Sequence, residues 1–146
     1  TKAFGGTVVL DEENAETGTF EITKTPEAIH DPIYSNLPDK FFAQLGHKDH
    51  VGEMPDGAIR LAFSERSSVQ AFTFEGEPIY ATIFHPEMDD EATVFRLVHY
   101  ARQFGLSDLA LQELKDSVKP SNEAVRVLQH FFDHVVVRGE RYRAVD

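Results

Sequence analysis

Short apolar segments, each bounded by turn-forming residues, fill the first half of the chain. From Gly18 to Thr25, apolar and polar positions alternate, which is typical of a strand with one buried face. Proline and glycine at 26–38, 54–57 and 75–78 mark loops and turns between such segments. The pattern predicts strands at residues 7–10, 18–25, 41–45, 58–64, 69–74 and 79–84.

The connecting segments predict how these strands pair. The acidic residues 11–14 suit a hairpin-like turn that would pair the first two strands, and residues 75–78 would join the last two in the same way. Residues 46–51 are predicted to form a loop after the strand at 41–45. We therefore expect antiparallel strands, of which the last, at 79–84, is buried.

The apolar period lengthens to that of a helix in the second half of the chain. A first helix is predicted with Asp89 or Asp90 as its N-cap and Gly105 at its end. Its apolar stripe consists of Val94, Leu97, Val98 and Ala101. A short second helix would begin after Ser107 and stop before Pro120.

A third, longer helix is predicted from its cap Ser121 to Gly139. The residues expected to form its buried stripe are Val125, Leu128, Phe132 and Val135. Residues 138–146 are expected to form a polar tail. Strands followed by helices make an α+β order if the chain is complete, without the alternation that opens a doubly wound fold.

Composition narrows the possible functions. Of 146 residues, 41% are apolar, which is enough for a buried core. With 25 acidic against 14 basic residues and no basic cluster, the formal charge is −11, so nucleic-acid binding is not expected. The apolar runs are too short to span a bilayer or to form a signal peptide, so we expect a cytoplasmic protein without membrane contact. The absence of cysteine excludes disulfides, thiolate metal sites and a cysteine nucleophile in this sequence.

A histidine and a glutamate, His85 and Glu87, follow the last predicted strand with Pro86 between them. If the backbone stays extended, the two side chains point the same way and the carboxylate can accept a hydrogen bond from one imidazole nitrogen. The other nitrogen could then take a proton from a nucleophile, as the base of a catalytic triad does. Taken alone, the spacing is more typical of a polar surface pair at a strand end.

The surrounding motifs occur in the order that one enzyme family shows. They are Gly46-His47-x-Asp49-x-Val51, Met54-Pro55-x-Gly57-Ala58, Leu61-Ala62-x-Ser64, Val69-Gln70-Ala71-Phe72 and Phe84-His85-Pro86-Glu87. Upstream, Gly5-Gly6-x-Val8-Val9 and Asp31-Pro32-Ile33-Tyr34 fit the same order. From Phe4 to Gln103 the sequence resembles the C-terminal half of a class I (triad-type) glutamine amidotransferase domain, in the subgroup similar to the GMP synthase amidotransferase.

The resemblance implies a flavodoxin-like α/β fold. Residues 1–104 would be its C-terminal half, with mostly antiparallel strands and then helices, and residues 105–146 a helical extension with a polar tail. The implied reaction is hydrolysis of glutamine, or of a γ-glutamyl compound, through a cysteine thioester. Ammonia would pass to a synthetase in most relatives, and no cofactor is expected.

The resemblance also implies a role for individual residues. His85 would be the general base and acid, and Glu87 would orient it. Gly46, His47 and Asp49 would line the pocket for the substrate, with Asp49 holding the shape of its loop.

Three departures from the family pattern bear on activity. Gly46 replaces the usual serine and Ile83 replaces the usual glutamine. The G-x-C-x-G nucleophile elbow, which precedes the Gly5-Gly6 region in the family, is absent. We therefore expect no turnover from the chain alone, and we expect an N-terminal half carrying the cysteine, in the same gene product or a separate chain, as its partner. The alternative is a non-catalytic interaction module that kept the fold without the nucleophile.

The remaining histidines suggest no metal site. Two histidines and an aspartate at 47–50 have suitable side chains, but no fourth ligand is evident. His130 and His134 lie four residues apart and are expected to face solvent. His99 is expected to be a partly buried residue of the first helix.

Overall fold

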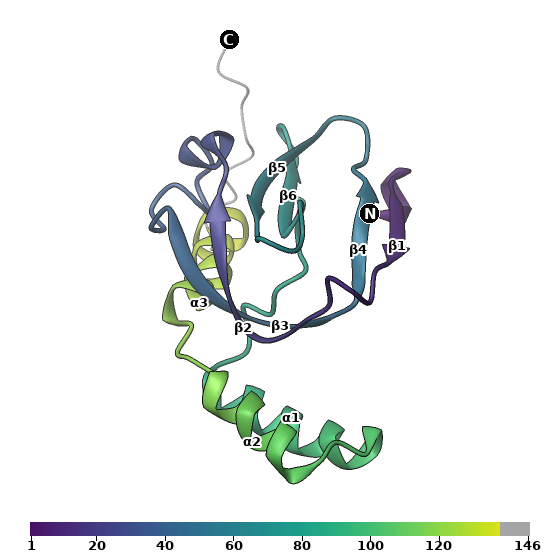
Figure 1. The fold of residues 1–146 in the computed structure, drawn as a ribbon. Coiled ribbons are helices and arrows are strands. Elements are labelled where there is room, and N and C mark those ends of the chain that lie inside the picture. The colour runs from purple at the N-terminus through teal and green to yellow at the C-terminus, as the bar shows by residue number, and fades with distance from the viewer. Residues whose placement is uncertain (138–146) are drawn as a thin grey trace.

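The computed structural model describes residues 1–137 and shows curved antiparallel sheets followed by helices (Figure 1). The strands are β1 (Thr7–Leu10), β2 (Glu16–Lys24), β3 (Lys40–His47), β4 (Asp49–Glu53), β5 (Ala58–Phe63), β6 (Ala71–Phe74) and β7 (Tyr80–Thr82). The helices are α1 (Asp90–Phe104), α2 (Asp108–Ser117) and α3 (Asn122–Phe131), with the π-helix η3 (Phe132–Val137) and the short 3₁₀ helices η1 (Lys2–Phe4) and η2 (Pro26–Ile29). No helix in this part of the chain is long and apolar enough to cross a bilayer.

The strands form two antiparallel sheets. Five of them pair in the order β3-β2-β5-β6-β7, and β1 pairs with β4. The hairpin predicted between the first two strands is therefore wrong, because Val9 lies opposite His50. β2 is paired with β3 from Glu16 through Thr23, a longer run of cross-strand contacts than the four-residue β1 can offer. The predicted final hairpin is confirmed by the pairing of β6 with β7.

The segment at 46–51, predicted as a loop, is mostly strand. β3 runs to His47 and β4 begins at Asp49, so Lys48 alone separates them. β4 then leaves the five-stranded sheet and pairs with β1. The strand conformation of β4 depends on pairing with β1, which lies near the N-terminus, and no local sequence signal marks β4 as a strand.

The last strand is shorter and less buried than predicted. Within the stretch 79–84, only Tyr80–Thr82 is strand, and its residues are half-buried because β7 lies at the edge of the sheet. The residue that enters the core is Phe84, which is 1% exposed. The chain bends at Ile83 and Phe84 and then forms a single bridge, in which the N–H of His85 donates to the carbonyl oxygen of Gln44 at 2.8 Å. The extended backbone expected through Pro86 is not present, because residues 85–88 form a turn in which the N–H of Met88 donates to the carbonyl oxygen of His85 at 3.2 Å.

The main core lies between the five-stranded sheet and α3. Its largest apolar members are Ile22, Ile33, Tyr34, Phe41, Leu61 and Phe84, joined by Ala124 and Val127 from α3. The side-chain amide of Gln44 on β3 donates to the carbonyl oxygen of Lys119 at 2.8 Å and to the hydroxyl of Ser121 at 3.1 Å. These buried hydrogen bonds fix the start of α3 against the sheet.

The buried face of α3 differs from the predicted stripe. Ala124 and Val127 are buried, whereas the predicted core residues Leu128 and Phe132 are 43% and 56% exposed. Of the predicted stripe, Val135 packs against the core. Ser121 begins the helix as predicted, but its hydroxyl bonds Gln44 and does not cap the helix, and this anchor sets which face turns inward. The predicted end at Gly139 and the predicted polar tail lie outside the described residues.

α1 and α2 form a hairpin that stands apart from the main core (Figure 1). The carboxylate of Asp89 caps α1 by accepting from the N–H of Ala92 at 2.7 Å, and Gly105 ends it in the left-handed conformation. The hydroxyl of Ser107 caps α2 by accepting from the N–H of Ala110 at 3.2 Å. The predicted caps of both helices are confirmed.

A buried carboxyl group holds the loop before β3 in place. Oδ1 of Asp31 accepts from the backbone N–H groups of Ile33 and Tyr34 at 2.9 and 3.0 Å, and Oδ2 accepts from the hydroxyl of Tyr80 at 2.8 Å. Burial raises the pKa of Asp31 above its ordinary value of 3.8, and the hydrogen bonds only partly oppose this effect. The folded state therefore binds the Asp31 proton more tightly than the unfolded chain does.

This pKa shift predicts a pH-dependent difference between the protein and its Asp31→Asn variant. The contribution of the protonated group to stability is fully present below pH 3.8 and is lost as pH rises through the higher folded pKa. We expect the unfolding free energy of the wild type, minus that of the variant, to fall as pH rises above 3.8 and then to level off. Urea unfolding across a pH series measures this difference, and a difference that grows with pH would contradict the assignment.

Candidate active site

His85 and Glu87 lie just beyond β7, in a turn that begins where His85 bridges to Gln44 on β3. Nδ1 of His85 lies 2.7 Å from Oε1 of Glu87, so the predicted hydrogen bond between the two side chains is confirmed. A carboxylate oxygen can only accept, so Nδ1 carries the hydrogen and Nε2 of the neutral ring is left as the acceptor. The imidazole, with 30% of its side chain exposed, keeps the nitrogen that a general base needs.

The electrostatics of Glu87 support this orientation. Burial alone would raise the pKa of Glu87, but its own backbone amide, His85 and the charge of Arg96 together lower it below the ordinary value of 4.5. Glu87 is therefore a carboxylate near neutral pH. It can hold the imidazole in one tautomer and stabilise the imidazolium that forms when the ring accepts a proton.

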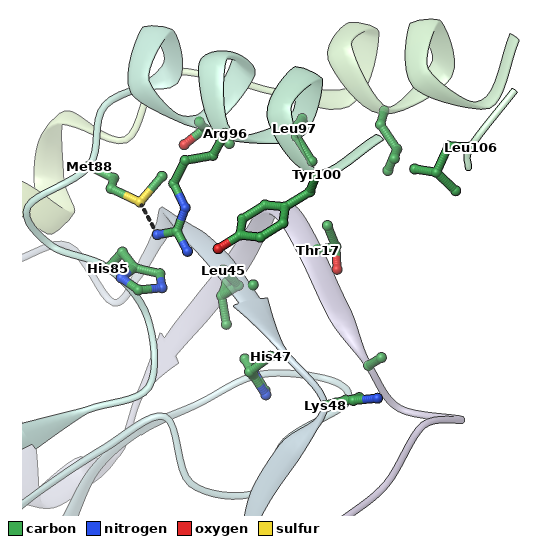
Figure 2. A pocket seen from close by; sticks show the side chains of 14 residues that line it. Thr17, Leu45, His47, Lys48, His85, Met88, Arg96, Leu97, Tyr100 and Leu106 are labelled. Atoms are coloured by element: carbon green, nitrogen blue, oxygen red, sulfur yellow. Dashed lines mark hydrogen bonds between the residues drawn. The ribbon is translucent and has the colours of Figure 1, made fainter. Parts of the chain in front are cut away.

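A cavity of about 630 Å³ lies between His85 and the α1–α2 hairpin (Figure 2). It opens between α1, α2 and the ends of β2 and β3 that meet near Lys48. Its polar lining residues are Thr17, His47, Lys48, His85, Thr93, Arg96 and Tyr100. The rest of the wall is apolar or small, and includes Leu45, Met88, Leu97, Leu106 and Leu114.

Only some of the residues suggested for substrate binding line this cavity. Gly46 and His47 line it, together with His85. A Cβ at Gly46 would meet nothing within 4 Å, so the serine of the family pattern would fit there. Asp49 is exposed on β4 and is not part of the wall, but its carbonyl oxygen bonds Nδ1 of His47 at 3.0 Å. Glu87 also lies outside the wall and acts on it through His85.

A buried polar network behind His47 was missed by sequence reasoning. Glu16 is 0% exposed, and its Oε2 lies 3.0 Å from Nε2 of His47 and accepts from the amide of Gln70 at 2.6 Å. The same amide donates to the hydroxyl of Ser64 at 3.1 Å. These contacts fix the ring that lines the cavity. The only sequence signal was the short Glu16-Thr17-Gly18 stretch, which alone does not identify a partner.

Arg96 is a second residue that the sequence did not single out. Its guanidinium lies in the cavity, 5.6 Å from the ring centroid of Tyr100, and donates to Sδ of Met88 at 3.1 Å (Figure 2). Arginine and tyrosine one turn apart on a helix usually indicate a solvent-facing surface, so the pattern gave no reason to place them beside His85.

The other histidines occupy ordinary structural positions. Within residues 1–137, no three histidine or carboxylate side chains are grouped as metal ligands would be. His99 is exposed and not partly buried, so that prediction is wrong. His130 is not solvent-facing as predicted, because it is half-buried and its Nδ1 donates to the carbonyl oxygen of Ile33 at 2.7 Å. His134 is half-buried on the π-helix that follows α3.

Comparisons with known proteins agree with this geometry. The sequence is 36% identical over 88 residues to a subunit of the glutamine-hydrolyzing GMP synthase of Methanococcus vannielii, covering 60% of this chain and 44% of that protein. The corresponding subunit of Methanopyrus kandleri is 37% identical over 89 residues, which is 60% of this chain and 45% of that protein. The chain thus spans less than half the length of these curated relatives.

Solved structures show the same fold. A glutamine amidotransferase from Thermotoga maritima superposes with a TM-score of 0.66 at 20% identity, over 92% of this chain and 56% of that one. The glutamine amidotransferase of Methylobacillus flagellatus gives a TM-score of 0.60 at 20% identity, over 99% and 61%. The curled antiparallel sheet followed by helices is therefore consistent with the expected flavodoxin-like α/β fold. The family model described as glutamine amidotransferase class I matches residues 1–97, and the chain belongs to this family.

Proposed function

We propose that the chain supplies the histidine and glutamate of a Cys-His-Glu triad that hydrolyses glutamine or a γ-glutamyl amide. The observation that carries this proposal is the 2.7 Å contact between Nδ1 of His85 and Oε1 of Glu87 at the wall of a cavity large enough for an amino acid. The nucleophile would come from a cysteine on another segment, because this sequence contains none. That segment could belong to the same gene product or to a separate chain.

The proposed chemistry uses both nitrogens of His85. Nε2 would take the thiol proton, and the thiolate would attack the side-chain amide carbon of the substrate. The imidazolium would return the proton to the leaving nitrogen, so that ammonia departs and a thioester remains. A water molecule, deprotonated by the same Nε2, would then hydrolyse the thioester and release the acid and the thiol. Glu87 would keep Nδ1 protonated throughout.

The exposed strand β1 supports the idea of a partner segment. All four of its residues are exposed, and Val8, Val9 and Leu10 are apolar. In the part of the chain that the structure describes, β1 pairs with β4 alone, so its other edge offers backbone groups to a further strand. An apolar strand edge of this kind favours pairing with a further strand. We propose that the cysteine-bearing segment covers this face.

The names of the relatives suggest the fate of the ammonia. They are glutamine-hydrolyzing GMP synthases, and the proteins of Methanococcus vannielii and Methanopyrus kandleri are each named as one subunit of that enzyme. By analogy, a synthetase on a second subunit would consume the ammonia that this site releases. An assembly of this kind would put the proposed glutaminase half in contact with at least two partners.

Reconstitution with a cysteine-bearing segment tests the proposal. We expect the 146-residue chain alone to hydrolyse glutamine no faster than buffer does. Mixing it with the nucleophile-bearing N-terminal segment of one of these GMP synthase relatives should restore hydrolysis and trap a thioester, detected by mass spectrometry. If a complex forms with an accessible thiol but yields no thioester with glutamine or a glutamine-like electrophile, the non-catalytic interaction module becomes the better account.

A further inference from the structure

The charge of the cavity differs from that of the whole chain. The protein carries 25 acidic and 14 basic residues, yet among residues 1–137 no aspartate or glutamate lines the cavity. The ionisable groups in its wall are instead two histidines and the cations Lys48 and Arg96, apart from the phenol of Tyr100. A water-accessible hollow with cations and no carboxylates attracts anions.

We propose that Arg96 binds a carboxylate group of the substrate in this cavity, so that the site selects amides that also carry an acid. The inference rests on the proposed function, because it names the substrate class of the same site. Arg96 and His85 line one cavity, so a short amino acid such as glutamine can place its carboxylate at the guanidinium while its amide approaches the imidazole.

The contacts of Arg96 leave its charge available. Of the five N–H donors of the guanidinium, one is used in a hydrogen bond to a described residue, from Nη1 to Sδ of Met88. Thioether sulfur is a weak acceptor, and the contact with the face of Tyr100 orients the group without neutralising it. Within residues 1–137, no carboxylate lies within ion-pair distance of Arg96. The planar group can therefore offer two parallel N–H bonds to an incoming carboxylate.

Two groups could compete with this interaction: a carboxylate of the protein that binds Arg96, or another cation that binds the substrate. Both candidates already have partners. Arg96 is close enough to lower the pKa of Glu87, but Oε1 of Glu87 is held by His85. The other cation of the cavity, Lys48, donates to Oε1 of Glu12 at 3.0 Å. Arg96 is thus the cation of the wall whose charge is least compensated among the described residues.

The proposal can be tested without any turnover by comparing the binding of two small molecules that differ only in whether they carry a carboxylate. Glutaramate is glutamine without its amino group, and in glutaramide an amide replaces the carboxylate. We expect titration calorimetry or NMR to show that the chain binds glutaramate and that Arg96→Gln weakens this binding about 10- to 100-fold. Glutaramide should bind weakly to both proteins. Arg96→Lys should give an intermediate loss, because it keeps the charge and removes the fork.

A matched control and a folding check complete the experiment. Arg126→Gln removes an arginine on α3, away from the cavity, and should leave glutaramate binding unchanged. Circular dichroism establishes that each variant is folded. The proposal is overturned if the wild type fails to bind glutaramate, or if the folded Arg96→Gln variant binds it as tightly as the wild type.

The outcome is separable from that of the proposed function. Arg96-dependent binding of glutaramate without thioester formation in the reconstituted pair would retain the carboxylate site and reject the triad. If the reconstituted pair forms a thioester but Arg96→Gln binds glutaramate as tightly as the wild type does, the triad is retained and the carboxylate site is rejected.

Discussion

Replacing His85 by alanine should lower the glutamine turnover of the reconstituted pair by about 10²- to 10⁴-fold, the usual contribution of a positioned general base. The imidazole carries Nε2, the acceptor that would take the thiol proton, and no other histidine contacts Glu87 through a described hydrogen bond. Binding of the two segments should not change, because His85 acts on a proton and not on the apolar face of β1. Turnover is measured as ammonia release, and assembly by sedimentation.

Two further variants define the specificity of this effect. Glu87→Gln should cost less than His85→Ala, because it removes the carboxylate but leaves the base in place. His99→Ala removes an exposed imidazole on α1 and should have no effect on turnover. Equal losses from His85→Ala and His99→Ala would mean that neither acts as the base.

Replacing Glu16 by alanine should destabilise the fold by about 1–3 kcal/mol, the range found when a buried polar group loses its hydrogen-bond partner. Glu16 is 0% exposed and bonds both His47 and Gln70. Its loss leaves Nε2 of His47 without its partner and leaves the amide of Gln70 with only the hydroxyl of Ser64, which is costly in a low-dielectric interior. The unfolding free energy from urea denaturation measures the effect.

The neighbouring pair between Glu12 and Lys48 provides a matched control. Its N–O distance is 3.0 Å, the same as that between Glu16 and His47, but the side chains of Glu12 and Lys48 are 69% and 59% exposed. Glu12→Ala should therefore change stability by less than about 1 kcal/mol. If the two alanine variants lose similar amounts, burial does not govern the strength of the pair at His47.

Local features of the structure could be predicted because their interactions are close in sequence. The hydrogen bond between His85 and Glu87 joins two residues of one tight turn, so the short sequence separation alone limits the distance between the side chains. The caps at Asp89 and Ser107 and the end of α1 at Gly105 also depend on groups within a few residues. The order of motifs then indicated the family, which the match over residues 1–97 shows.

The tertiary structure decided the features that join distant segments. β4 exists as a strand because β1 pairs with it, and α3 is rotated away from the predicted stripe because Gln44 anchors its start. Glu16 and His47 are 31 positions apart and meet only across the β2–β3 pairing.

The same holds for the charge of the cavity. Arg96 enters the wall only because the α1–α2 hairpin lies beside the ends of β2 and β3, with the cavity that His85 also lines between them. The periodicity of a single helix defines which residues share a face, but not which element lies opposite that face. The sequence by itself therefore predicted that His85 and Glu87 would form a hydrogen-bonded pair, whereas the position of the α1–α2 hairpin relative to the sheet decided what surrounds them.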